Sequence, residues 1–312
     1  MAVGVQDMPE VARRALCASV SSASAEPLAA TASRIDHWIL VEYRGLWDRD
    51  VLGGSLLSSE VKTHLRGQLR ALGDARLLFL KKPERRSYGR RQLFFGTSAP
   101  GRERFFQLEF DRHDDLVGLD LAAALSGAET PGVPLEHPLF VVCTHGKRDR
   151  CCAKYGRPLY DALRRETESE WVWQSTHVGG DRFAGNVVVF PAGLYFGRVG
   201  REDVRPLLHE HAAGNVLLER YRGRSAYSFA VQAAEHAVRV EAGFVGVDDL
   251  ALLAAEEREG GWLTRFRDAT GAVHEVEVDE VRGEEAVYLT CGAVTPQHAR
   301  RYAATSHRVT RP

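Results

Sequence analysis

The sequence predicts a mixed α/β (α+β) protein made of two tandem βαβββα units and a smaller C-terminal α+β domain. Short runs rich in β-branched and aromatic residues alternate with amphipathic stretches, and the same order of elements occurs twice. The last hundred residues change to alternating strands. At 312 residues, with 44% apolar and 27% charged residues, the chain is long enough to form several globular cores.

The first unit is expected over residues 34–130, after an N-terminal segment, 1–33, that contains one short helix at 11–18. Its strands and helices are expected, in βαβββα order, at 38–43, 59–72, 76–80, 92–95, 105–110 and 116–125. In the first of these helices apolar residues recur every three or four positions, and Gly73 follows. That pattern is typical of an amphipathic helix that ends at a glycine.

The second unit, expected over residues 131–215, repeats this order. Its elements are expected at 139–142, 158–165, 171–176, 186–190, 194–199 and 204–212. Pro158 would then stand in the first turn of its helix, where the missing N–H is tolerated. Because the two units share no identity visible by eye, only the order of elements suggests a tandem of thioredoxin-like halves.

Residues 216–312 are expected to form the small C-terminal α+β domain. Its helices are expected at 227–240 and 247–258, and its strands at 262–267, 273–278 and 286–290. The alternation in these strands indicates an antiparallel sheet with one solvated face. The basic tail, 297–312, is expected to be partly disordered.

Composition narrows the classes of partner and compartment. A net charge of -1 and a pI near 6.9 give no indication of a nucleic-acid or anionic-membrane partner. No apolar run is long enough to cross a bilayer, and the N-terminal apolar stretch is too short for a signal sequence. Three of the five cysteines lie within ten positions, which favours metal or redox chemistry in a reducing compartment. We therefore expect a cytoplasmic protein.

The most distinctive feature is a polar loop with cysteines at both ends. Cys143 ends an expected strand, and Cys152 lies nine positions later, far enough along the loop for the two sulfurs to converge. His177 follows the next strand and can reach the same place if the two strands are neighbours. Asp149 is a candidate cap for a helical turn at Cys151 and Cys152, and a helix N-terminus lowers the pKa of a thiol.

Two stretches carry a resemblance to a known family. The loop reads Val-Cys-Thr-His-Gly-Lys-Arg-Asp-Arg-Cys-Cys over 142–152, and the next strand is followed by His-Val-Gly-Gly-Asp-Arg-Phe-Ala-Gly-Asn-Val over 177–187. These stretches resemble the sucrase/ferredoxin-like family, whose cluster domain is a thioredoxin-like [2Fe-2S] ferredoxin. The resemblance is strong over about residues 136–200, looser over 17–57 and weak in the C-terminal third.

The resemblance implies an iron-sulfur cluster held by Cys143, Cys152 and His177. Its best understood members have a second histidine four residues after the first, where this chain has Asp181. A carboxylate is a hard ligand that suits a soft iron-sulfur site poorly. The fourth ligand therefore stays open among Asp181, Cys151, His145 and the distant Cys291.

Other residues near the motif have structural alternatives. Gly179 and Gly180 permit a tight turn, or they let backbone N–H groups approach cluster sulfurs. Arg148 is either part of the site or a solvated charge, and His177 alone would be a hydrogen-bonded structural histidine. We interpret Cys17 as a small buried apolar group.

Four functions fit these residues. We favour a one-electron carrier with mixed Cys/His ligation of a [2Fe-2S] cluster, which would need an unidentified redox partner protein or reductase. A thiol-disulfide protein ranks lower because the chain lacks a C-x-x-C pair. A structural zinc protein and a non-catalytic thioredoxin-like binding module also remain open. Sucrose hydrolysis has little support, since no pair of carboxylates is singled out by its spacing.

Overall fold

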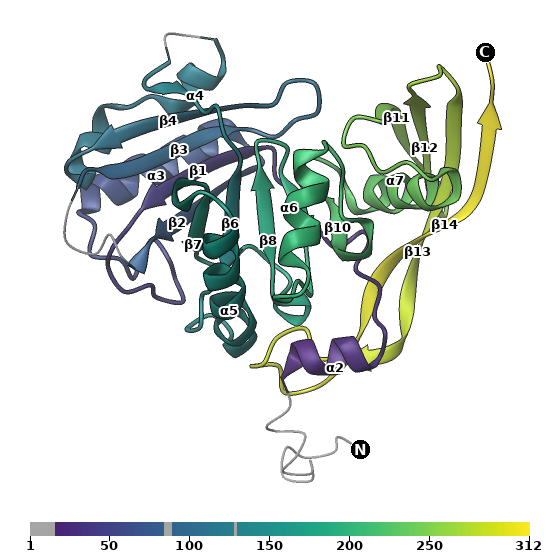
Figure 1. Ribbon diagram of the computed structural model, residues 1–312, viewed down its shortest axis with the longest axis horizontal. Coiled ribbons are helices and arrows are strands. Elements are labelled where there is room, and N and C mark those ends of the chain that lie inside the picture. Colours follow the sequence, from purple (N-terminus) through teal and green to yellow (C-terminus); the bar gives the residue numbers. More distant parts are fainter. Residues whose placement is uncertain (1–15, 84–88, 128–129) are drawn as a thin grey trace.

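The computed structural model describes residues 16–83, 89–127 and 130–312, and it confirms the mixed α/β class (Figure 1). A ten-stranded sheet contains the strands of both units, and a separate four-stranded sheet lies near the C-terminus. The helix predicted at 11–18 falls largely outside the described residues. The first described helix is α2, Cys17–Ala23.

The first unit has the predicted order of elements. They are β1 (His37–Glu42), α3 (Ser59–Leu72), β2 (Ala75–Lys81), β3 (Arg91–Thr97), β4 (Arg104–Phe110), the 3-10 helix η3 (His113–Gly118) and α4 (Leu121–Leu125), with β5 (Val133–Pro134) after them. The Ser58 side chain caps α3 by accepting a hydrogen bond from the N–H of Val61, and Gly73 ends the helix with a φ of 71°. The single helix predicted at 116–125 is divided between η3 and α4.

The second unit also follows the predicted order. Its elements are β6 (Leu139–Cys143), α5 (Arg150–Glu166), η4 (Ser169–Trp171), β7 (Val172–Ser175), η5 (Asp181–Phe183), β8 (Val187–Phe190), β9 (Leu194–Phe196) and α6 (Val204–Ala212). The prediction was wrong about where α5 begins. Asp149 caps the helix, so Pro158 lies in its interior rather than in its first turn.

The two units have the same sheet topology. The strand order is β10-β9-β8-β6-β7-β2-β1-β3-β4-β5. In each unit the first two strands are parallel, and the third strand pairs antiparallel with the first. An antiparallel contact between β2 and β7 joins the units, with Leu80 opposite Ser175. Strand β10 (Tyr221–Arg224), which follows the boundary expected after residue 215, pairs with β9 and extends the same sheet.

Both faces of the large sheet are covered. Ile39 and Val41 point into a core with α3 and α4, while Trp38 and Leu40 point into a core shared with strands of the second unit. The ring of Trp38 lies edge-on to that of Phe190, with centroids 4.8 Å apart. This two-sided burial explains why the strands read as continuous apolar runs rather than as alternating patterns.

The C-terminal region corrects three predictions. It contains η6 (Leu218–Arg220), α7 (Phe229–Ala242), β11 (Leu250–Arg258), β12 (Gly261–Asp268), β13 (Val273–Val287) and β14 (Gln297–Thr310). The stretch 247–258 was predicted as a helix because it is rich in Leu, Ala and Glu, but most of it is β11, which pairs with β12 across a glycine turn. Residues 297–310 of the tail predicted as partly disordered form β14, which pairs along β13. The strands predicted at 273–278 and 286–290 are not separate, because β13 covers the first and reaches into the second.

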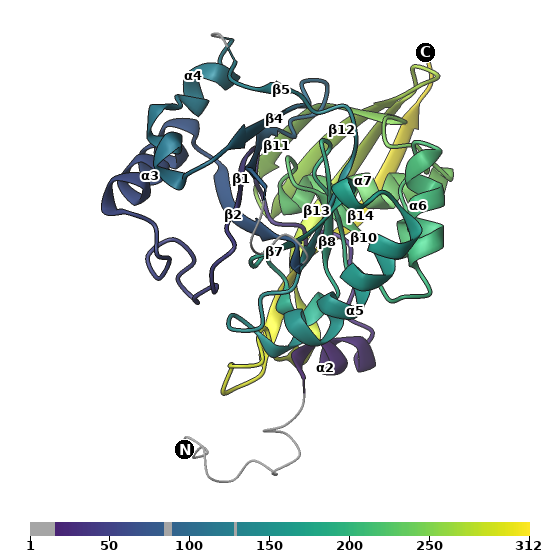
Figure 2. The same cartoon turned by 60° about the vertical axis from the view of Figure 1, so that its left-hand side comes forward.

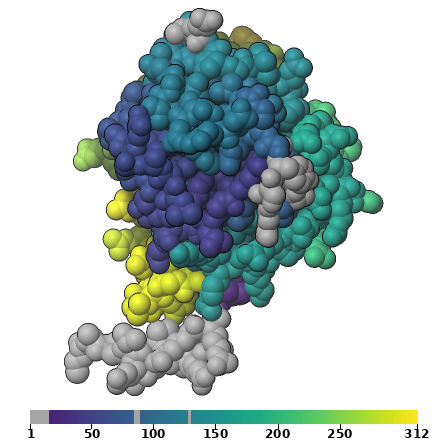
Figure 3. Space-filling view, turned by 90° about the vertical axis from the view of Figure 1, so that its left-hand side faces the viewer, coloured from purple at the N-terminus to yellow at the C-terminus, as the bar shows by residue number. Residues whose placement is uncertain are grey.

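The hairpin of β13 and β14 reaches away from its own sheet. Its turn, residues 288–296, lies beside α2 and the N-terminal end of α5 (Figures 1 and 2). Figure 3 views the molecule from the side of the first unit, and yellow atoms of the C-terminal region emerge below that unit. Among the described residues, no helix is both long enough and apolar enough to span a membrane.

Candidate metal centre

The position of Cys143 follows from the pairing of β6. All five residues of this strand are buried. The N–H of Cys143 donates to the carbonyl of Asn186 at 3.0 Å, and the N–H of Thr144 donates to that of Ser175 at 3.1 Å. Because β6 and β7 are parallel neighbours, their carboxyl ends meet at one edge of the sheet. Residues that follow the two strands can therefore share a site there.

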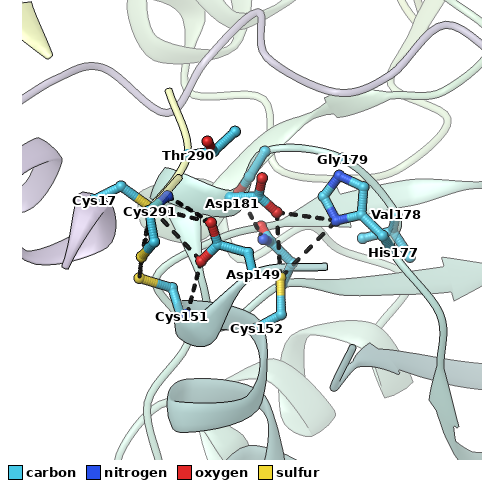
Figure 4. Close-up of polar contacts among 12 residues, drawn as sticks. Cys17, Asp149, Cys151, Cys152, His177, Val178, Gly179, Asp181, Thr290 and Cys291 are labelled. Carbon is cyan, nitrogen blue, oxygen red and sulfur yellow. Dashed lines mark hydrogen bonds and ion pairs between the residues drawn. The ribbon is translucent and has the colours of Figure 1, made fainter. Parts of the chain in front are cut away.

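Helix α5 brings the second thiol to this edge. The side chain of Asp149 accepts a hydrogen bond from the N–H of Cys151 at 2.8 Å, as the sequence suggested for a helix cap. Successive helical residues point about 100° apart, so Cys151 and Cys152 face different sides of the first turn (Figure 4). A Cβ on Gly156 would lie 2.0 Å from the carbonyl oxygen of Cys143, so glycine permits the close approach of α5 to β6.

Three donor side chains converge at this edge, and a fourth, Asp181, contacts two of them. Figure 4 shows Cys152, His177 and Asp181 pointing toward one another. The ligand atoms of Cys143, Cys152 and His177 all lie within 4.8 Å of one another. Oδ1 of Asp181 lies 3.0 Å from Nδ1 of His177 and 3.4 Å from Sγ of Cys152, and the last two atoms are 3.9 Å apart. Asp181 and both thiols are buried, while the His177 side chain is 20% exposed. The arrangement offers two sulfurs, one nitrogen and one oxygen to a metal.

The protonation states favour a thiolate in this site. Cys152 donates a hydrogen bond to Cys143 and so lowers the pKa of Cys143 well below its usual value. Burial opposes this change, and His177 lowers the same pKa further. The same hydrogen bond and burial raise the pKa of Cys152. Burial also raises the pKa of the Asp181 carboxyl, although His177 opposes this. A thiolate held in a buried site is a ready ligand for a soft cation.

The other candidate ligands lie elsewhere. Cys151 and Cys291 belong to a separate group of thiols, described below. His145 is buried with its ring edge-on to Trp47 at 5.8 Å, and neither of its ring nitrogens has a hydrogen-bond partner among the described residues. Burial lowers the pKa of His145. Arg148 is half-buried, and its backbone N–H donates to the carbonyl of His145 at 3.1 Å.

The turn after His177 requires both of its glycines. Gly179 and Gly180 have φ values of 103° and 77°, a region that favours glycine. An added Cβ would lie 2.3 Å from Ser33 Oγ at Gly179 and 2.3 Å from the Arg222 guanidinium at Gly180. The need for a tight turn therefore explains why both residues are glycines.

Arg222, which was not predicted from the sequence, supports this turn. Its fully buried guanidinium donates to the carbonyl of Gly179 at 3.1 Å and to Oδ1 of Asn186 at 2.8 Å. Burial lowers the pKa of Arg222 to about 10, while the negative charges of Cys143 and Asp181 oppose that change. No local signal identifies this arginine, because it is brought to the site by β10.

A second group of thiols, also not predicted from the sequence, lies at the start of α5. Cys17 is buried, as expected for a small apolar residue, but its sulfur lies 3.5 Å from that of Cys151. The hydrogen bond from Cys17 lowers the pKa of Cys151 to about 7, and burial raises the pKa of Cys291 to about 11. The odd number of cysteines was the only hint in the sequence, since these residues are far apart along the chain.

Comparisons with known proteins agree with the motif. The sequence model of the sucrase/ferredoxin-like family matches residues 28–223. A protein named "Altered inheritance of mitochondria protein 32" from Meyerozyma guilliermondii is 38% identical over 95 residues, or 27% of this chain and 34% of that protein. Its namesake from Debaryomyces hansenii is 34% identical over 95 residues, or 27% of this chain and 35% of that protein. The matches span about a third of these relatives.

Two similar solved structures come from Aquifex aeolicus. Its thioredoxin-like [2Fe-2S] ferredoxin is 19% identical, with a TM-score of 0.26, over 29% of this chain and 94% of that protein. A cysteine-to-serine variant of the same ferredoxin is 20% identical, with a TM-score of 0.24, over 27% of this chain and 97% of that protein.

Proposed function

This chain belongs to the sucrase/ferredoxin-like family, and from that membership we propose that it is a one-electron carrier with a [2Fe-2S] cluster. Cys143, Cys152 and His177 would be three of its ligands, and Asp181 would be the fourth. When bound, such a cluster accepts and returns a single electron. The observation that carries the proposal is the convergence of Cys143, Cys152 and His177 at one edge of the sheet, with Asp181 in contact with the last two.

The donor atoms fit such a cluster. Cysteine thiolates and histidine nitrogens are its usual ligands. Asp181 is harder, but it faces the same ring nitrogen of His177 that faces Cys152. A carboxylate that only oriented the histidine would instead contact the other ring nitrogen. We therefore assign Asp181 to the ligands, and we expect it to be the weakest of the four.

The protein's own residues would shield the site and leave one side open. Cys143, Cys152 and Asp181 are buried and exclude water, whereas part of His177 reaches the surface. We therefore propose that the unidentified redox partner or reductase docks over His177. The name of the relatives refers to mitochondria, so we propose a mitochondrial location as an alternative to the cytoplasmic one expected from composition. Cell fractionation distinguishes the two.

Zinc at the same donors is the second candidate. Two sulfurs, one nitrogen and one oxygen also match the four-coordinate sites of structural zinc. A thiol-disulfide function is less favoured by the geometry, because Cys143 is only 1% exposed and a partner's disulfide could not reach it.

Anaerobic purification of the full chain, with analysis of iron, acid-labile sulfide and zinc, tests the proposal. We expect about two iron atoms and two sulfides per chain, a visible chromophore, and an EPR signal after reduction. Cys143→Ser and Cys152→Ser should each lower the iron content by at least about tenfold, since even changes to outer partners cost about 10–100-fold in affinity. Zinc without iron in the wild-type chain would contradict the proposal.

Variants of the other two donors test the ligand set. His177→Ala should destabilise the cluster or shift its spectrum, and an unchanged spectrum and potential would remove it as a ligand. Asp181→His should keep the cluster but change its EPR signal, whereas Asp181→Ala should lose iron more readily. Asp161→Asn is a matched control, because Asp161 is exposed on α5, and it should change nothing.

A further inference from the structure

A second group of metal-binding side chains lies on the other side of the first turn of α5. The sulfurs of Cys17 and Cys151 are 3.5 Å apart, those of Cys151 and Cys291 are 3.2 Å apart, and those of Cys291 and Cys17 are 3.6 Å apart. With a carboxylate oxygen of Asp149, all the ligand atoms lie within 4.8 Å of one another. The group is separate from the Cys143 site, and Asp149 lies between the two in Figure 4.

Three distant parts of the chain build this group. Cys17 is the first residue of α2, Cys151 lies in the first turn of α5, and Cys291 lies in the turn between β13 and β14. Cys151 is 134 residues from Cys17 and 140 residues from Cys291. Local structure therefore cannot account for the convergence of the three thiols. It requires the terminal segments to be folded onto α5.

The carboxylate is held in place among the sulfurs. One oxygen of Asp149 accepts the N–H of Cys151 at 2.8 Å, and the other accepts the N–H of Cys291 at 2.6 Å. Each carboxylate oxygen has a further lone pair, so these bonds leave Asp149 able to act as a ligand. Cys17 and Cys151 are almost completely buried, while Cys291 is partly exposed. The site is thus largely closed to solvent and lies near the surface on the side of Cys291.

We propose that Cys17, Cys151, Cys291 and Asp149 form a second metal site, which binds a thiolate-preferring divalent cation of the zinc type. Three thiolates and one carboxylate supply four donors, the number that structural zinc takes, and they leave no open position for a substrate. A disulfide would use two of the thiols, would leave the third unpaired and would need an external oxidant. A metal uses all three thiols and needs none.

The expected role of this metal is to hold α2 and the β13–β14 turn against α5. The cation would tie α2 and the β13–β14 turn to the first turn of α5, and binding that closes such long loops contributes directly to folding. Cys151 directly precedes Cys152, a proposed ligand at the first site. The second metal would therefore also fix the helical turn that presents Cys152.

Metal analysis of the full-length protein tests this inference independently of the electron-carrier proposal. The wild-type chain should hold about one zinc atom. The double variant Cys17→Ser with Cys291→Ser should lose that zinc and keep iron and sulfide. The double variant Cys143→Ser with Cys152→Ser should lose iron and keep zinc. Ser22→Ala, an exposed change on α2, is the matched control and should keep both metals.

If the double variant Cys17→Ser with Cys291→Ser does not fold, a second measurement tests whether the second metal site exists. Cobalt(II) added to the Cys143→Ser, Cys152→Ser chain after its zinc has been removed with a chelator should give the visible absorption of a tetrahedral, thiolate-bound ion, and zinc should displace it. Zinc retained without Cys17 and Cys291, or no such cobalt spectrum, would overturn the inference. So would a disulfide between any two of the three cysteines in protein purified with reductant. Zinc at this site in a chain that never binds iron would refute the electron carrier alone.

Discussion

The two βαβββα units have the same topology, but they differ at the ends of their first strands. Glu42 is the last residue of β1 and pairs with Leu80 of β2, and Cys143 is the last residue of β6 and pairs with Ser175 of β7. Glu42 therefore occupies in the first unit the position that Cys143 occupies in the second. The Glu42 carboxylate is fully buried and is paired with Arg44 at 2.8 Å. Its other oxygen accepts a backbone N–H at 3.0 Å. The first unit therefore has a permanent ion pair where the second has a thiol.

The same contrast appears two residues after Leu80 in the first unit and two residues after Ser175 in the second. Lys82 corresponds there to His177, and it is buried with its ammonium group donating to the carbonyl of Ser169 and to the Glu170 carboxylate. Glu42 and Lys82 are thus each paired, the first within its own unit and the second with η4 of the second unit, whereas the corresponding groups of the second unit lie around a common point. In both units the fold brings the ends of neighbouring strands to one edge of the sheet. The residue types at that edge decide whether it contains buried ion pairs or a group of possible metal ligands.

The largest effect is expected from removing the buried charge of the first unit. Glu42→Ala leaves Arg44 without its partner, and breaking a buried ion pair costs about 3–5 kcal/mol. The free energy of unfolding, from denaturant titration followed by circular dichroism, should fall by about this amount, while the folded fraction keeps its metal content. Glu60→Ala, an exposed change on α3, is the control. Loss of iron in folded Glu42→Ala would show that the two edges are coupled.

A glycine in the equivalent helix of each unit gives a matched pair. Gly156→Ala on α5 would bring a Cβ against the carbonyl of Cys143, whereas Gly67 on α3 has nothing within 4 Å. Gly156→Ala should cost about 1–3 kcal/mol through overpacking and should weaken metal binding. Gly67→Ala should instead stabilise the chain by about 0.5–1 kcal/mol. Thermal unfolding and metal analysis measure both effects, and equal responses would contradict the close packing of α5.

The smallest effect concerns Arg222, the buried cation beside the second unit's site. A nearby positive charge favours the more negative, reduced state of a redox centre, so Arg222→Gln should lower the potential. We expect a decrease of about 30–60 mV in a redox titration, where about 59 mV is tenfold for one electron. Arg205→Gln, an exposed arginine on α6, should leave it unchanged. A rise in potential with Arg222→Gln would refute this electrostatic role.

Local patterns predicted most of the large sheet and the core of the candidate site. Apolar periodicity identified the strands and helices of both units, and the loop from Cys143 to Cys152 with His177 was recognisable from residue types alone. Periodicity failed at 247–258, where helix-forming residues make a strand. There, pairing with β12 outweighs the intrinsic preference, which amounts to a few tenths of a kcal/mol per residue.

The sequence by itself determined most of the strands and helices of the two βαβββα units and which of them end in a thiol or an imidazole. Periodicity, caps and turn residues act over a few positions, so they can be read along the chain. Only the tertiary structure decided that Asp181 contacts His177 and Cys152 and that Cys151 faces away toward Cys17 and Cys291. Those contacts depend on how segments up to 274 residues apart are packed together, and spacing along the chain carries no information about that packing.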